Sequence, residues 1–114
     1  MRIKRVETLI KHEISNILLH EVSDPRMGFV TITKVEVSKD IKFAKVYYSV
    51  LGTDDQIKKT GEGLKSATGY IKKIIGQRLE LRFIPQIIFL LDDSVRKSMK
   101  MYHLLEDLEK EENK

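Results

Sequence analysis

The fold of this protein is decided by residues 64–82, which read LKSATGYIKKIIGQRLELR. Apolar residues recur there at helical spacing, while lysines and arginines stay off the apolar stripe. A glycine inside a helix costs about 1 kcal/mol relative to alanine, so Gly69 marks a break. The stretch predicts two helices that meet at Ala67-Thr68-Gly69. Small residues beside cations would let a nucleic-acid backbone come close, but a tight helix crossing relieved by glycine would give the same pattern.

The composition is that of one soluble domain. The chain has 114 residues, 41% of them hydrophobic and 33% charged, which is enough to bury roughly 65% of the unfolded surface in one core. The absence of cysteine excludes disulfides, a thiol nucleophile and a thiolate metal site. No apolar run approaches the ~18 residues of a membrane helix, and the first residues lack a signal-peptide pattern. We expect one cytoplasmic domain over residues 1–114, a monomer that contacts no membrane.

The charge of the chain is unevenly distributed. The net charge is +4. Residues 101–114 contain two lysines and five carboxylates, a net −3, which leaves +7 on the first hundred residues. A basic body with a short acidic tail, frayed over about residues 109–114, indicates a polyanionic partner.

The N-terminal segment predicts an amphipathic helix over residues 2–21. Its apolar residues recur every three or four positions. Its first turns are basic, with Arg2, Lys4 and Arg5. Cations at a helix N-terminus oppose the helix macrodipole, so helix stability does not explain their placement. Contact with a ligand and a solvated face remain equally open explanations.

Two strands follow, and they predict an antiparallel hairpin. Residues 29–37 are rich in β-branched side chains, and their apolar alternation changes phase between Ile32 and Val35, which indicates either a bulge or a partly two-faced strand. The second strand covers residues 42–50, with the even positions from Ala44 to Val50 facing the core.

The second half of the chain predicts two central helices, a strand and a last helix. Thr53 and Gln56 form a capping box. Residues 86–91 are a continuous apolar run, typical of a strand buried on both faces. Asp92-Asp93-Ser94 caps the last helix. The order αββααβα predicts an α+β fold, a three-stranded sheet with helices packed on one face and the other face bare.

The carboxylates do not suggest catalysis. Asp54 and Asp55 follow the capping threonine at a positive helix end, and Asp92 and Asp93 lack a third ligand at metal spacing. We therefore expect no catalytic residues, no metal site and no cofactor.

These elements are similar to the type II K-homology (KH) fold, a module that binds single-stranded nucleic acid, usually through a Gly-x-x-Gly loop. The chain has no such loop; Ala67-Thr68-Gly69 resembles instead the Ala-x-Gly interhelical kink of the ribosome-binding factor A family. Other segments resemble that family in the same order, from Arg2 to about Leu105: Arg5-Val6, Asp24-Pro25-Arg26, Val37-Ser38-x-Asp40, Ala44-x-Val46-Tyr47, Ser49-x-Leu51-Gly52, Leu81-Arg82-x-x-Pro85 and Phe89-x-x-Asp92-x-Ser94.

The resemblance implies a non-catalytic assembly factor. Such a factor binds the small ribosomal subunit during late maturation, near the 5′-terminal helix and central pseudoknot of its RNA. It is associated with cold adaptation and is released by a partner GTPase. The chain departs from the family at Lys72, where arginine is frequent, which affects bidentate phosphate geometry. It also ends soon after the last helix, so roles of longer tails do not carry over.

The hypothesis for the site is a basic surface beside the corner. Phosphate contacts set affinity and salt dependence but not sequence choice. Three alternatives remain: a generic single-stranded RNA-binding domain, a protein-interaction adaptor that uses the bare sheet face or the hairpin edge, and an RNA-processing enzyme. The expected RNA-binding residues are Arg2, Lys4, Arg5, Lys65, Ala67, Thr68, Gly69, Lys72, Lys73 and Arg78.

Overall fold

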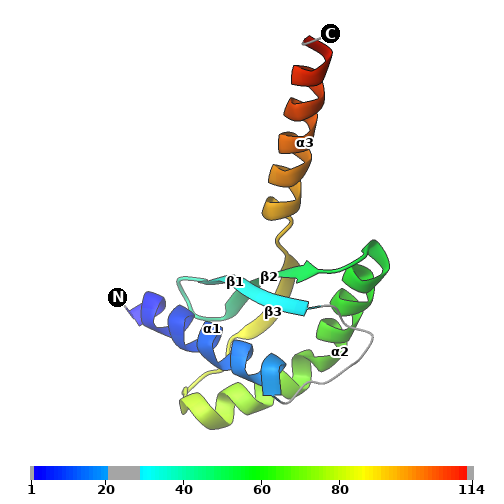
Figure 1. Ribbon diagram of the computed structural model, residues 1–114. Helices are drawn as coiled ribbons and strands as arrows, with labels where there is room; N and C mark the ends of the chain where they lie inside the picture. Colours follow the sequence, from blue (N-terminus) through cyan, green and yellow to red (C-terminus); the bar gives the residue numbers. More distant parts are fainter. Residues whose placement is uncertain (1, 21–28, 113–114) are drawn as a thin grey trace.

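The computed structural model describes residues 2–20 and 29–112, so the Asp24-Pro25-Arg26 turn expected from the sequence lies outside the described residues. Helices α1 and α2 cover one face of a sheet, and α3 rises from the opposite side (Figure 1). The elements in chain order are α1 (Arg2–His20), β1 (Phe29–Val37), β2 (Phe43–Leu51), α2 (Asp54–Leu79), β3 (Gln86–Leu91) and α3 (Ser94–Glu112).

The sheet has three strands in the order β1-β2-β3. β1 and β2 are antiparallel, and β2 and β3 are parallel. The register between β1 and β2 shifts between Ile32 and Lys34, which confirms the bulge that the phase change predicted. On β2, Ala44, Val46 and Tyr48 are buried, so the predicted inward face is also confirmed.

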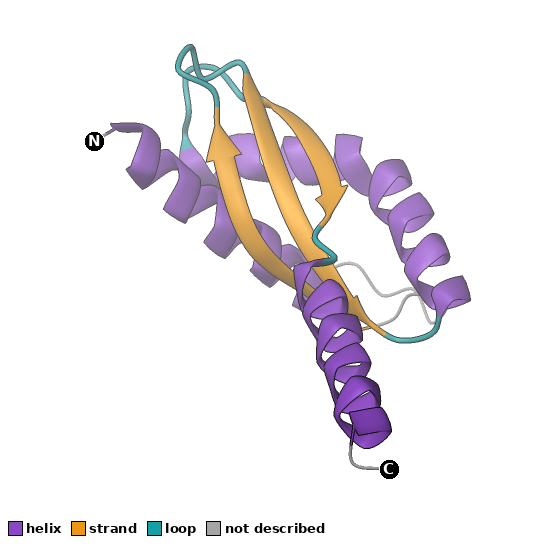
Figure 2. Ribbon diagram, turned by 90° about the horizontal axis from the view of Figure 1, so that it is seen from above, coloured by secondary structure: helices purple, strands orange, loops and turns teal. Residues whose placement is uncertain are grey.

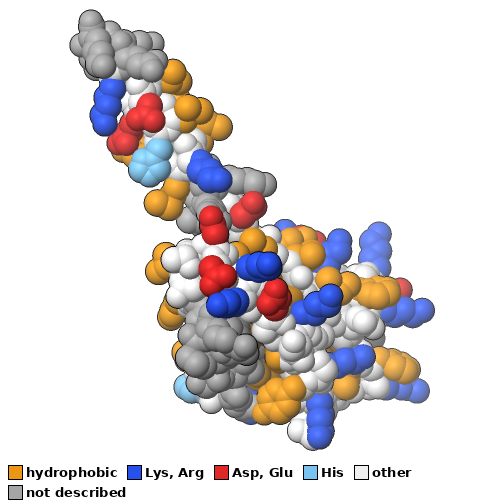
Figure 3. Space-filling model, turned by 90° about the vertical axis from the view of Figure 1, so that its right-hand side faces the viewer, with side chains coloured by type: hydrophobic (Ala, Val, Ile, Leu, Met, Phe, Trp, Pro, Cys, Tyr) orange, Lys and Arg blue, Asp and Glu red, His pale blue; other side chains and the backbone are white. Residues whose placement is uncertain are grey.

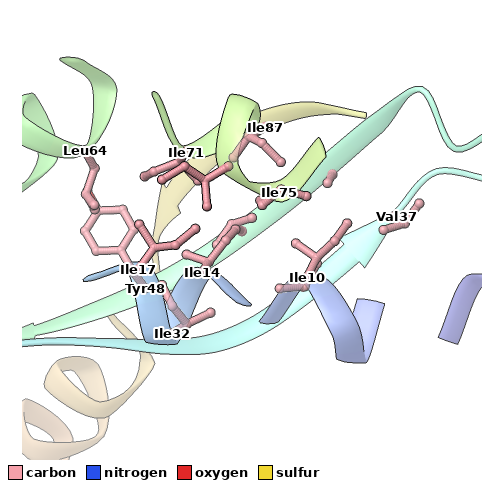
Figure 4. Close-up of a cluster of buried hydrophobic side chains, with 14 residues drawn as sticks. Ile10, Ile14, Ile17, Ile32, Val37, Tyr48, Leu64, Ile71, Ile75 and Ile87 are labelled. Carbon is pink, nitrogen blue, oxygen red and sulfur yellow. The ribbon is translucent and has the colours of Figure 1, made fainter. Parts of the chain in front are cut away.

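The core lies between the sheet and the two helices α1 and α2 (Figure 4). Helix α1 contributes Ile10, Ile14 and Ile17, each 0% exposed. They recur at four- and three-residue spacing, which places them on one side of a helix. Helix α2 and the inner faces of the three strands supply the other buried side chains: Ile32, Val35, Val37, Ala44, Val46, Tyr48, Leu64, Ile71, Ile74, Ile75 and Ile87.

Helix α2 differs from the expected pair of helices. It is one continuous helix of 26 residues that changes direction along its length (Figures 1 and 2). The Thr68 hydroxyl donates a hydrogen bond to the carbonyl of Leu64, 2.9 Å away. A threonine that bonds back to the preceding turn often bends a helix. The corner at Ala67-Thr68-Gly69 is therefore a bend within a helix rather than a break.

The start of α2 agrees with the sequence. Thr53 and Gln56 form the predicted capping box: the Gln56 amide donates to the Thr53 hydroxyl and the Thr53 amide donates to the Gln56 side chain. Asp54 and Asp55 lie in the first turn, where the positive end of the helix dipole stabilises them. The two carboxylates therefore have a structural role at the start of α2.

Two sequence predictions for the last elements were wrong. β3 is an edge strand with one buried face, because Ile87 is 4% exposed whereas Ile88, which points to the other face, is 37% exposed. The apolar stripe of α3 is not packed on the sheet: Tyr102, Leu105 and Leu108 are about half exposed, and the helix projects from the body. Residues 109–112 belong to α3, and fraying of the tail stays a prediction. A run of apolar residues reveals hydrophobicity, but it does not reveal whether a neighbouring layer exists.

None of the described helices is long and apolar enough to cross a membrane.

The first prediction concerns the contact of α2 with the segment before β3. A Cβ atom at Gly76 would meet the end of the Ile84 side chain, whereas a Cβ atom at Gly69 would meet nothing within 4 Å. We expect Gly76→Leu to lower the free energy of unfolding by roughly 1–3 kcal/mol through overpacking, measured by urea denaturation. Gly69→Leu is the matched control and should not destabilise the chain. Equal losses in both variants would show that helical position, not contact with Ile84, sets the effect.

The second prediction concerns Asp92, which joins the sheet to α3. Its carboxylate accepts hydrogen bonds from the Thr33 hydroxyl at 2.8 Å and from the Ser94 amide at 3.0 Å. The bonds to Ser94 and Thr33 lower the pKa of Asp92 below its ordinary value of 3.8. Because the folded pKa is lowered, the carboxylate stabilises the fold above the unfolded pKa, and this contribution is lost as the pH falls through the folded pKa.

Titration of carboxyl carbon shifts by NMR should give a depressed pKa for Asp92, and Thr33→Val should raise that pKa. An Asp92 pKa at or above its ordinary value in the unmodified chain would contradict the hydrogen-bonded geometry.

Candidate nucleic-acid interface

The solvent side of α2 carries a row of lysines. Lys58, Lys65 and Lys72 are spaced by seven residues, which is two helical turns, about 10 Å along the axis, with a drift of only about 20° per step. Lys58 and Lys65 are exposed and Lys72 is half-buried. None of the three has an ion pair among the described residues. We call these three residues the lysine row.

The bend of α2 lies between the second and third members of the lysine row. Gly69 is exposed and a Cβ atom there would point into open space. Ala67 is half-buried and packs against the core. Thr68 is half-buried, and its hydroxyl proton already goes to the Leu64 carbonyl. The bare surface at Gly69 therefore admits a ligand backbone, while Ala67 and Thr68 shape the bend from inside.

The other cations expected on α2 lie in different surroundings. Lys73 is exposed. Arg78 forms an ion pair with Glu13 of α1, with 3.3 Å between the guanidinium nitrogen and the carboxylate oxygen. This pair joins the two helices that cover the sheet. Lys59, on the first half of α2, is paired with Asp55 at 3.0 Å.

The basic N-terminus of α1 forms a separate group. Lys4 and Arg5 are exposed, and the side chain of Arg2 is outside the described residues. Glu7 accepts a hydrogen bond from the Val37 amide at 2.8 Å, which holds this helix beside the β1–β2 connection. In both ribbon views this end of the molecule lies opposite the bend of α2. The predicted site residues are thus divided between two ends of the body.

Two residues of the α2 surface were missed by the sequence analysis. Lys58 completes the lysine row, and its seven-residue spacing from Lys65 was visible in the sequence. Tyr70 is one of the apolar residues of the stretch 64–82, but it is 50% exposed next to Gly69. An exposed aromatic ring beside cations is the type of side chain on which nucleic-acid bases stack. Figure 3 shows the lysine and arginine side chains that project from the body on the side of α2.

The shifted pKa values belong to structural contacts rather than to the α2 surface. The Lys34–Glu36 pair, with 2.6 Å between nitrogen and oxygen, raises the pKa of Lys34 and lowers that of Glu36. Hydrogen bonds from Ser38 and the Lys42 amide lower the pKa of Asp40. Burial raises the pKa of Tyr48. Over the described residues, no group of three or more His, Cys, Asp or Glu side chains is placed to hold a metal ion.

Solved structures support the fold. A Thermotoga maritima protein assigned to ribosome binding factor A, determined by NMR, superimposes with a TM-score of 0.69 at 37% identity, covering 78% of this chain and 85% of that one. The crystal structure of ribosome-binding factor A from Thermus thermophilus also gives 0.69, at 21% identity, covering 78% and 93%. A homology model of the Thermus thermophilus factor, fitted into a cryo-electron microscopy map of its complex with 30S, gives 0.61 at 21% identity, covering 80% and 91%.

The sequence comparisons extend over nearly the whole chain. The chain is 47% identical over 111 residues to ribosome-binding factor A of Halothermothrix orenii, covering 97% of this chain and 91% of that protein. It is 45% identical over 112 residues to the same factor of Caldanaerobacter subterraneus, covering 97% and 92%. The family model described as ribosome-binding factor A matches residues 2–105. With its KH-like sheet and helices and its relatives of this similarity, the chain belongs to the ribosome-binding factor A family.

Proposed function

We propose that this protein binds the free small (30S) ribosomal subunit and assists late maturation of its 16S RNA without catalysing a reaction. The observation that carries the proposal is the lysine row, which has no ion pair among the described residues and lies beside the open surface at Gly69 on the solvent side of α2, in a chain of the ribosome-binding factor A family. The Thermus thermophilus factor placed in a 30S complex shares this fold. The expected contact near the 5′-terminal helix, the release by a GTPase, the role in cold adaptation and the cytoplasmic location rest on the family resemblance.

The mechanism follows from the geometry of α2. Because the helix is continuous, most of the amides around the bend are used in helical hydrogen bonds. The side chains of the lysine row must therefore supply the contacts to phosphate, and Gly69 lets the RNA backbone approach closely. Tyr70 offers a ring to an unpaired base. Binding holds one conformation of the RNA against others, a population shift that needs no chemical step.

The third prediction tests the lysine row. Lys65→Gln with Lys72→Gln should weaken cosedimentation with free small subunits and reduce the slope of log affinity against log salt by about 1.5, since each phosphate contact contributes about 0.7–0.9. The control is Lys45→Gln with Lys110→Gln, which removes the same charge from exposed positions outside α2. If both double variants lose affinity equally, net charge rather than the lysine row governs binding.

The fourth prediction separates RNA binding from folding at the bend. Gly69 has no positive φ and nothing lies near its missing Cβ, so Gly69→Ala should stabilise the helix by about 1 kcal/mol, measured by thermal unfolding. The same methyl group should weaken binding to the small subunit, because it occupies the surface that the RNA backbone needs. A variant that is more stable and binds as well as the unmodified chain would remove Gly69 from the interface.

The same cosedimentation series tests the proposed function as a whole. Saturable binding to free small subunits that exceeds binding to whole ribosomes and bulk RNA is the expected result. Equal binding to bulk RNA would instead identify a generic RNA-binding domain.

A further inference from the structure

Helix α3 exposes an apolar stripe. Met101, Leu104, Leu105 and Leu108 recur at three- and four-residue spacing, which gathers them on one side of the helix. They are 58%, 55%, 55% and 49% exposed. The helix projects from the body (Figure 1), and Figure 3 shows apolar side chains along one edge of it. A soluble helix normally buries such a stripe against another element.

The charges of α3 are arranged against its own dipole. The first half contains Arg96, Lys97 and Lys100 with no acidic residue in the first turn, whereas the second half contains five carboxylates and one lysine up to Glu112. Cations near a helix N-terminus and anions near its C-terminus are both destabilising. The stability of a solitary helix therefore does not account for this arrangement.

We propose that α3 is a dimerisation helix that packs antiparallel against α3 of a second copy of this chain. In an antiparallel pair the basic half of each helix lies beside the acidic half of the other. The opposite charges then attract, and each helix end receives from its partner the charge that its dipole favours. The two apolar stripes cover one another at the centre, Met101 of one copy lying toward Leu108 of the other.

The symmetry of such a pair also places individual charges correctly. A two-fold axis across two antiparallel helices brings the same flank of each helix together. Lys100 and Asp107 are seven residues apart and both exposed, so they share a flank. The two-fold axis passes near the middle of the apolar stripe. Lys100 of one copy therefore lies close to Asp107 of the other. A partner of uniformly acidic or uniformly basic character would match only one half of α3, so a second copy is the occupant that fits both halves.

The dimer goes beyond the proposed function and does not compete with it for surface. α3 rises from the side of the sheet opposite α1 and α2, so the lysine row stays accessible in the pair. A contact between two helices of 19 residues is small compared with standard interfaces of about 800 Å² per partner. The expected association is therefore in the micromolar range. This proposal differs from the monomer that the sequence led us to expect.

The test is sedimentation velocity of the full chain over a roughly hundredfold range of micromolar concentrations. The apparent mass should rise from 13.3 kDa toward twice that value. Leu105→Glu should abolish the rise, and because Leu105 is 55% exposed the body should unfold at an unchanged temperature. Leu19→Glu, the same change at a 71% exposed leucine of α1, is the control and should associate like the unmodified chain. A mass that stays at 13.3 kDa across the range would overturn the proposal.

Charge reversal tests the antiparallel arrangement directly. One variant carries Lys100→Glu, and the other carries Asp107→Lys. Each should remain monomeric alone, because like charges then face one another, and an equimolar mixture should associate at least as strongly as the unmodified chain. If each variant self-associates as before, the chain pairs through another surface and the proposal fails. Binding of the small subunit by both variants is read separately, so failure of the dimer leaves the RNA-binding proposal standing.

Discussion

The length of α2 relative to the sheet is the constraint on which the rest of the structure depends. A straight helix of 26 residues would span about 39 Å, whereas strands of nine residues span about 30 Å. The buried positions of α2 run from Thr60 to Ile75, about 23 Å along the axis, so they fit over the sheet while the full length of the helix exceeds it. The helix bends near the middle of this buried stretch, where the Thr68 hydroxyl bonded to the Leu64 carbonyl supports the bend from inside.

The bend also determines how the surface is divided. The concave side of α2 belongs to the core with Ile10, Ile14 and Ile17 of α1, so cations are confined to the outer side. Arg78 is the exception, and it is held by Glu13 of α1. Both packed helices lie on one face of the sheet. Of the helices that the structure describes, α3 alone lies on the side of the opposite face, and it leaves the body at Asp92 and Ser94. One side of the molecule thus presents the lysine row, and the other presents the apolar stripe of α3 beside charged strand residues such as Lys34 and Glu36.

The sequence predicted those features that depend on local periodicity. The phase change in β1 predicted the bulge at Thr33, and the alternation of β2 predicted which face is buried. The pair Thr53 and Gln56 predicted where α2 begins. The sequence-based predictions were wrong where burial depends on whether another helix or strand packs on the residue. The exposure of Ile88 and of the α3 stripe is set by such packing, and the local sequence pattern does not contain that information. Lys58 was missed because one lysine per two turns looks like an ordinary solvated face until the helix proves continuous.

Because α2 is continuous, this site differs from a Gly-x-x-Gly loop in the chemical groups that it can offer to a phosphate. A loop turns unpaired backbone amides toward phosphates, and such contacts keep their strength when exposed charges are screened. Here the helical hydrogen bonds use most of those amides, and Thr68 directs its only proton to Leu64. What remains is lysine, a flexible point charge, whose attraction to phosphate falls steeply with salt. If the chain binds RNA as proposed, the open surface at Gly69 and the charge of the lysine row act together. Selectivity then comes from how closely the RNA fits the bend, and affinity comes from how many phosphates that fit brings within reach of the lysines.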